Sequence, residues 1–155
     1  MTDINITSRQ TVRMKLAGFL REQMRTPRNV LDHVPADLQA HYPATCVTGA
    51  PTNRQQEYGG EDTLENFFGF SVRNITAYHI DMQESSWTPK QAEDMLDTLE
   101  YELTLALRAA SRQVEALGFE SISRNGLSVI EGPYRIGGVS YLSETVPVIV
   151  QVDDE

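Results

Sequence analysis

Apolar side chains recur every three or four residues between Thr88 and Gly118, which is the spacing of residues along one face of an α-helix. Thr88 can cap such a helix, Pro89 suits its first turn, and Gly118 suits the left-handed position that ends it. The pattern therefore predicts a long amphipathic helix over about residues 88–117. Its apolar stripe needs a covering layer, for which a sheet is the natural candidate; the stripe consists of Met95, Leu99, Leu103, Ala106, Leu107, Ala110, Val114 and Leu117.

A second helix is predicted over about residues 8–24, before a Thr26-Pro27 pair that disfavours helical geometry. One face of this helix is apolar. Six of the 13 basic residues of the chain lie within or just after it, namely Arg9, Arg13, Lys15, Arg21, Arg25 and Arg28. Two interpretations stay open: a solvated helix face, or a surface that meets an acidic neighbour and could serve head-to-tail association of identical chains.

Alternation of apolar and polar residues predicts strands in the middle of the chain. The candidates are residues 44–50 and 67–81, and in the second the alternation shifts near Asn74, which indicates a bulge or bend. Between them lies a polar run, residues 51–66, which contains Gly59-Gly60 and four acidic residues. We interpret it as a long polar loop that would project from one end of a sheet.

Strand signals continue in the C-terminal part of the chain. Asn125-Gly126 lies between two strand candidates, 119–123 and 127–130, and predicts a β-hairpin. Valine occupies every second position of residues 146–152. Because Pro147 has no backbone N–H, this last strand is predicted to begin at an edge of the sheet, and an apolar edge favours oligomerisation.

Together these elements predict a single α+β domain of residues 1–155, in which a mixed, mostly antiparallel sheet is packed by the two helices. The 22 acidic and 13 basic side chains give a net charge of −9, which disfavours tight binding to a phosphate backbone. Cys46 is the only cysteine, so the chain cannot form an internal disulfide. The lack of a signal-like or membrane-spanning apolar run predicts synthesis in the cytoplasm.

The sequence contains no recognisable set of acid, base and nucleophile. His33, His41 and His79 are too scattered for a metal-binding spacing, although His79 and Asp81 would share a strand face. The glycine pairs at 59–60 and 137–138 lack the residues that accompany phosphate and dinucleotide loops. We therefore predict no catalytic, cofactor-binding or metal site, and a protein that is not an enzyme.

The order of elements has a counterpart in one known family. The strand candidate 67–80, followed by the capped helix 88–117 and the β-rich finish at 134–152, resembles the tail terminator proteins of tailed bacteriophages, a family of tail completion, neck or head-to-tail joining proteins. The resemblance implies a structural virion protein, made in the host cytoplasm, that forms a hexameric ring. The ring would cap the tail tube protein, meet the head connector or neck protein, and leave a channel for DNA without sequence-specific or membrane binding. Residues 51–66 would then be a contact arm.

Two alternatives remain open. Another neck or connector-completion protein would share nearly every feature and differ in its partner. A small-ligand-binding domain, or an enzyme with an unrecognised site, belongs to a different class, and a monomer with a deep apolar pocket near His79 would favour it. Large interfaces between identical chains would favour the ring.

Overall fold

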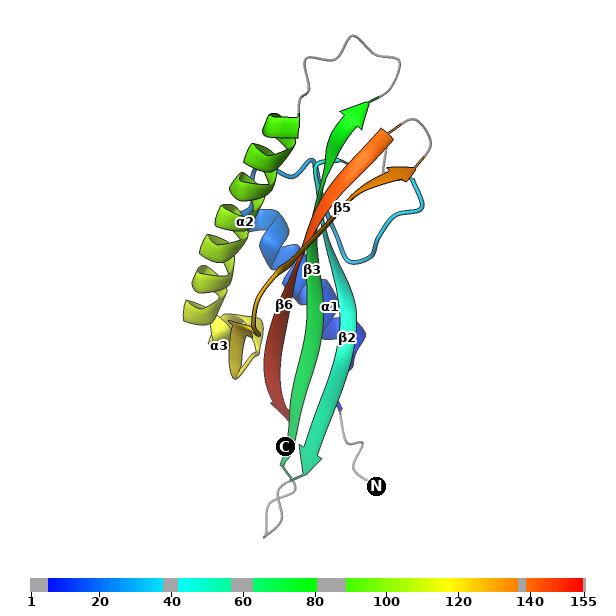
Figure 1. Ribbon diagram of the computed structural model, residues 1–155. Helices are drawn as coiled ribbons and strands as arrows, with labels where there is room; N and C mark the ends of the chain where they lie inside the picture. Colours follow the sequence, from blue (N-terminus) through cyan, green and yellow to red (C-terminus); the bar gives the residue numbers. More distant parts are fainter. Residues whose placement is uncertain (1–5, 38–41, 57–62, 81–88, 137–138, 155) are drawn as a thin grey trace.

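The computed structural model describes residues 6–37, 42–56, 63–80, 89–136 and 139–154 (Figure 1). Within these ranges the helices are α1 (Arg9–Gln23), α2 (Pro89–Arg112) and α3 (Val114–Leu117). The strands are β1 (Asn29–Leu31), β2 (Ala44–Gln56), β3 (Leu64–Ile80), β4 (Ser121–Arg124), β5 (Val129–Ile136) and β6 (Val139–Asp154).

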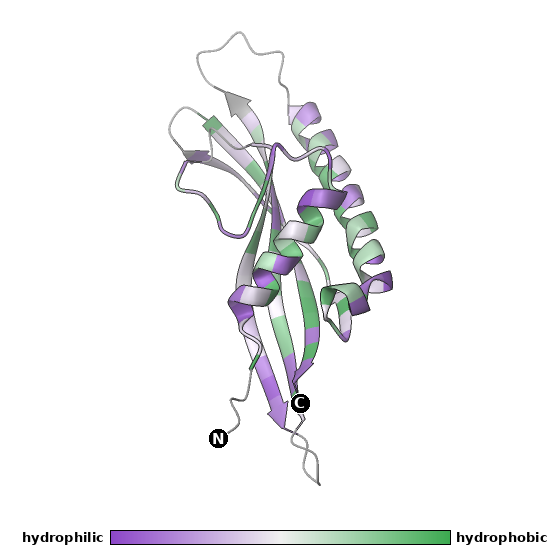
Figure 2. Ribbon diagram, turned by 180° about the vertical axis from the view of Figure 1, so that it is seen from behind, coloured by the Kyte–Doolittle hydropathy of each residue, from purple (hydrophilic) through white to green (hydrophobic). Residues whose placement is uncertain are grey.

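The strands form one sheet in the order β1-β2-β3-β6-β4, and β5 also pairs with β6. Strands β1 and β2 run parallel, whereas the other described pairs are antiparallel. Figure 2 shows α1 and α2 side by side on one face of this sheet. The predicted α+β class with a mixed, mostly antiparallel sheet is therefore confirmed.

Both predicted helices form. Helix α1 starts after Ser8, whose side chain accepts a hydrogen bond from the backbone N–H of Thr11 as an N-cap. The predicted 88–117 helix is divided near Gln113 into α2 and the short α3, and Gly118 ends α3 with a φ of +75°. Thr88, the predicted cap, lies outside the described residues.

The main core lies between the helices and the sheet. Phe68, Phe70 and Val72 of β3 point to this side, as do the four alternate valines of β6 from Val146 to Val152, and all are buried. The predicted apolar face of the last strand is thus confirmed. The carboxylate of Glu102 on α2 accepts the backbone N–H groups that follow α1, which joins the two helices within the same layer.

The change of alternation near Asn74 has a different cause from the predicted bulge. Asn74 pairs in register with both Thr45 and Glu144, and the register with β6 shifts later, between Ala77 and His79. Residues 74–77 are buried on both faces because α2 covers one side, while Leu31 and Tyr42 pack against the other. A strand covered on both faces loses its alternation without bending.

The prediction of a polar loop at residues 51–66 is wrong for most of its length. Strand β2 continues to Gln56 and β3 begins at Leu64, and the two pair as far as that end. Residues 57–62 lie outside the described residues. A polar sequence can still form a strand, because a strand needs only backbone pairing. The side chains of residues 53–56 are exposed, at a place where no core requires apolar groups.

The predicted hairpin around Asn125-Gly126 is also wrong. Strands β4 and β5 both pair antiparallel with β6, at Val148–Gln151 and Val139–Thr145 respectively, so they follow one another along the same side of it. Gly126 does adopt the positive φ of +95° that a turn signal predicts. The chain nevertheless continues along β6. That strand has 16 residues, so the side of it that does not pair with β3 is long enough for both β4 and β5.

The expected edge at Pro147 is wrong for a related reason. Strand β6 has β3 on one side and β4 and β5 on the other. Pro147 lies opposite the break between β4 and β5, and its carbonyl accepts the N–H of Asn125 at 2.9 Å. Since the N–H and C=O of a strand residue point to the same side, the missing N–H of Pro147 faces this break and interrupts no ladder hydrogen bond.

Candidate interaction surface

The segment of residues 127–134, which we call the edge segment, places apolar side chains on the surface. Leu127 is 91% exposed, and Val129, Ile130 and Tyr134 are 53%, 57% and 48% exposed. Strand β5 pairs with β6 on one side, and no described strand pairs with its other side. A free apolar strand edge is a typical site of protein association, because its backbone N–H and C=O groups can bind a further strand.

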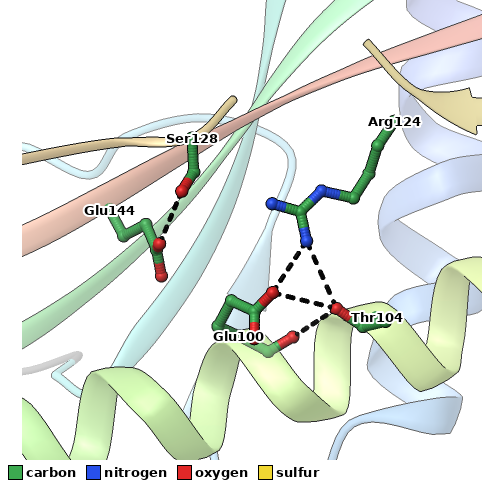
Figure 3. Close-up of polar contacts among 5 residues, drawn as sticks. All are labelled: Glu100, Thr104, Arg124, Ser128 and Glu144. Carbon is green, nitrogen blue, oxygen red and sulfur yellow. Dashed lines mark hydrogen bonds and ion pairs between the residues drawn. The ribbon is translucent and has the colours of Figure 1, made fainter. Parts of the chain in front are cut away.

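Polar contacts hold the start of the edge segment in place (Figure 3). Arg124 donates a hydrogen bond of 2.7 Å to Glu100 of α2 and lies 3.4 Å from the hydroxyl of Thr104. Ser128 donates a hydrogen bond of 2.7 Å to the carboxylate of Glu144 on β6, which is only 7% exposed. Because a buried carboxylate requires hydrogen-bond donors, the Ser128 contact is specific. The apolar side chains that follow are therefore presented from a fixed position.

The middle of the edge segment contains a bulge that only glycine fits. Gly132 has a φ of +113°, and a Cβ there would lie 2.7 Å from the backbone oxygen of Tyr141. The register with β6 shifts between Glu131 and Tyr134. The Tyr134 hydroxyl donates a hydrogen bond to Glu131, which raises the pKa of Tyr134 above its ordinary value.

The sheet face away from the helices is uncovered where β2, β3 and β6 run together, and it holds a hollow of about 570 Å³. Its apolar lining includes Ala50, Pro51, Phe67, Pro147 and Ile149, and no charged side chain lines it, although the chain has a net charge of −9. Val129 of the edge segment pairs with residue 145, which lies on the same face as residue 147. Arg73 also lies on this face, where its Nε donates a hydrogen bond of 3.2 Å to the hydroxyl of Thr145.

A polar cluster joins the segment before α1 to the end of β6. The backbone N–H and the hydroxyl of Thr7 both donate to Asp154, at 2.9 and 2.6 Å, and Asn66 donates to it at 2.7 Å. Arg54 donates to Asn66 and to the backbone oxygen of Thr7. Burial acts to raise the pKa of Asp154, but the hydrogen bonds from Thr7 and Asn66 outweigh it, so the pKa is lowered.

The residues considered for chemistry in the sequence do not converge within the described structure. His79 lies in β3 opposite Ser140, but its side chain, like Asp81 and His41, is outside the described residues. His33 lies beside Asp32 at 2.9 Å in an exposed position. Cys46 is buried, and burial raises the pKa of its thiol to about 11. Among the described residues, no group of three or more His, Cys, Asp or Glu side chains could hold a metal ion.

The sequence reasoning missed the exposed edge segment. The sequence predicts a strand at 127–130 and a β-rich finish from residue 134, but it does not show which side chains a helix covers. One signal in the sequence indicates the edge: Gly132-Pro133 lies between these two segments, and a proline within a strand favours an edge position.

The chain matches no model of a known protein family, and no curated protein is similar to it. None of the described helices is long and apolar enough to cross a membrane.

Proposed function

We propose that the chain is a structural virion protein of the tail terminator kind, which assembles into a ring, caps a phage tail tube and joins it to the head connector. The observation that carries the proposal is the edge segment, an apolar strand edge held in a defined position by Arg124 and Ser128. In a monomer such an edge favours uncontrolled association, whereas a closed ring of identical subunits covers it at every boundary. No catalytic role is part of the proposal.

The β2–β3 hairpin supports contact with a second component of the tail. Figure 1 shows its two strands running past α1 and α3 toward one end of the molecule. Toward this end the residues of β2 are polar, and residues 53–56 are exposed. A long ribbon with a polar surface can reach a neighbour without requiring burial in its own subunit, so it replaces the predicted loop as the contact arm.

The mass of the purified protein in solution tests the proposal. It should be measured by sedimentation across a series of protein and salt concentrations, with and without purified phage tail tubes, and the particles should be imaged by negative-stain electron microscopy. A ring of about six 17.4 kDa chains, formed alone or on tubes, is the expected result. A strict monomer that ignores tubes would contradict the proposal. Rings that bind connectors but not tubes would move the protein to another position in the neck.

The hollow on the uncovered sheet face favours a second candidate, binding of a small apolar ligand. Its volume of about 570 Å³ lies within the usual range for ligand sites, and its lining is uncharged. A panel of apolar compounds should then raise the melting temperature of wild-type protein but not of Ile149→Trp, which fills the hollow. If no compound gives a difference between the two proteins, this candidate is excluded.

A further inference from the structure

The link between β4 and β5 contains an asparagine followed by a glycine, Asn125-Gly126, and both residues are exposed. The backbone N–H of Asn125 donates a hydrogen bond of 2.9 Å to the oxygen of Pro147, which holds the main chain at this point. Asn125 also belongs to the lining of the hollow on the uncovered sheet face. The pair therefore lies beside the hollow and directly before the edge segment.

The two groups of this pair that can react with each other have no hydrogen-bond partner. Within the described part of the chain, neither the side-chain amide of Asn125 nor the backbone N–H of Gly126 makes a hydrogen bond. Gly126 has a φ of +95°, and a Cβ built there would meet no heavy atom within 4 Å apart from its chain neighbours. The N–H of Gly126 is therefore open to water. Because glycine has no Cβ, the adjoining peptide also rotates with little steric resistance.

The other asparagines of the chain differ from Asn125. All five are followed by a larger residue, so Asn125 is the only asparagine that precedes a glycine. Two of them are also buried and engaged. The amide of Asn66 donates to Asp154, and that of Asn74 accepts a hydrogen bond from Thr45. The sequence and the structure thus distinguish the same asparagine.

We infer that Asn125 is a site of self-modification, at which its side-chain amide becomes a carboxylate by deamidation. The backbone nitrogen of Gly126 loses its proton and attacks Cγ of Asn125. The N–Cγ bond forms, the Cγ–Nδ2 bond breaks, and the leaving nitrogen takes up a proton and departs as ammonia. Water then opens the resulting succinimide ring at one of its two carbonyl carbons and gives aspartate or isoaspartate. The net reaction consumes one water, releases one ammonia and needs no oxidant or reductant.

The conversion changes the start of the edge segment. Either product adds a negative charge beside a hollow that has no charged lining. Isoaspartate also adds one methylene to the main chain between the hydrogen bond to Pro147 and the hydrogen bond from Ser128 to Glu144. Because both bonds fix the chain against β6, the longer main chain cannot keep both in their present register. The reaction needs no neighbouring molecule, so this inference goes beyond the proposed function and does not depend on it.

Ageing of the folded protein tests the inference. Wild type and Asn125→Gln are kept dilute at mildly alkaline pH, sampled over time, digested at acidic pH and analysed by mass spectrometry. The wild-type peptide that contains Asn125 should gain about 1 Da, the difference between NH2 and OH. The rate should rise with pH, because the attacking nitrogen must lose its proton. Asn125→Gln should not convert on this timescale, since glutamine would have to form a larger ring. An isoaspartate-specific methyltransferase should label the aged wild type and not the aged variant.

A synthetic peptide of residues 121–130 and the other asparagines of the chain serve as controls. The expected result is conversion of the peptide and of Asn125 in the folded protein, with the other five asparagines unchanged. A peptide that converts beside a folded protein that does not would overturn the inference, because the fold would then hold Asn125 away from Gly126. Equal conversion at several asparagines would also overturn it.

Thermal unfolding tests the consequence for the edge segment. Aged wild type should melt at a lower temperature than fresh wild type, whereas ageing should leave the melting temperature of Asn125→Gln unchanged. If converted wild type melts like fresh protein, the main chain accommodates the product, and the predicted effect on the edge segment is wrong. None of these measurements requires assembly, so failure of the inference and failure of ring formation are distinguishable.

Discussion

Strands β3 and β5 both pair antiparallel with β6, yet one is buried and the other is exposed. Phe68 and Phe70 of β3 are at most 1% exposed, whereas Val129 and Ile130 of β5 are more than half exposed. Both strands contain the apolar residues that favour β-structure. The difference lies in the layer above them, because the helices cover the β3 side chains and no described element covers those of β5. Apolar strand residues therefore make a core where a helix covers them and an association surface where none does.

The largest effect on stability is expected from a charge on the covered side. Val148→Lys should reduce the free energy of unfolding by more than about 4 kcal/mol, because Val148 is 1% exposed and its replacement would bury an unpaired ammonium group. Urea denaturation followed by circular dichroism measures this loss. The matched variant on the uncovered strand, Ile130→Lys, should remain folded and lose assembly. A stable Val148→Lys protein would show that the helices do not cover this side of β6.

Truncation of an aromatic ring tests the same contrast without charge. Phe70→Ala should cost about 3–5 kcal/mol, since the cavity lies in the main core. Tyr134→Ala on β5 should change the free energy of unfolding by about 0.5 kcal/mol or less. Equal losses in the urea midpoint for the two variants would mean that β5 is covered in solution.

The anchor of the edge segment should have an intermediate effect. Ser128→Ala removes a hydrogen bond to the buried carboxylate of Glu144 and should cost about 1–3 kcal/mol. Thermal unfolding of the variant measures the loss, and Ser123→Ala, an exposed serine in β4, serves as the control. If Ser128→Ala and Ser123→Ala lose the same stability, the position of the edge segment does not depend on the hydrogen bond to Glu144.

The smallest effect is expected at the polar end of β6, and it depends on pH. The pKa of Asp154 is lowered in the folded protein, so its ionised form contributes stability above the pKa of the unfolded chain. This contribution is lost as the pH falls through the folded pKa. Asp154→Asn should therefore be less stable than wild type at pH 7, and the difference should shrink toward pH 3. If the difference in urea midpoint between wild type and Asp154→Asn does not change with pH, the shape of the side chain and not its charge causes the effect.

The sequence predicted the helices well and the strand pairing poorly. The period of apolar residues and the stop at Gly118 identified both helices, because hydrogen bonds within a helix join residues four positions apart. The hairpin predicted at Asn125-Gly126 and the edge predicted at Pro147 are both wrong. Both errors arose because the edge available on β6 depends on residues far away in the chain.

The candidate interaction surface was only partly accessible from the sequence. The basic character of α1 could be read directly, and association of identical chains followed as one interpretation. The exposure of Leu127 and Ile130 could not be read, because these residues have the composition of a core strand. The anchoring of the segment by Glu144 was also hidden, since its Ser128 partner lies 16 residues away.

By itself, the sequence determined the two amphipathic helices, the alternating face of the last strand, the acidic charge and the single cysteine, because each is a property of composition or of local spacing. Only the tertiary structure decided which strands meet, which sheet face the helices cover and which apolar residues stay exposed. Every residue except proline offers the same backbone N–H and C=O, so these groups do not decide which strands pair. The pairing that forms is the one that lets the whole fold bury its apolar side chains.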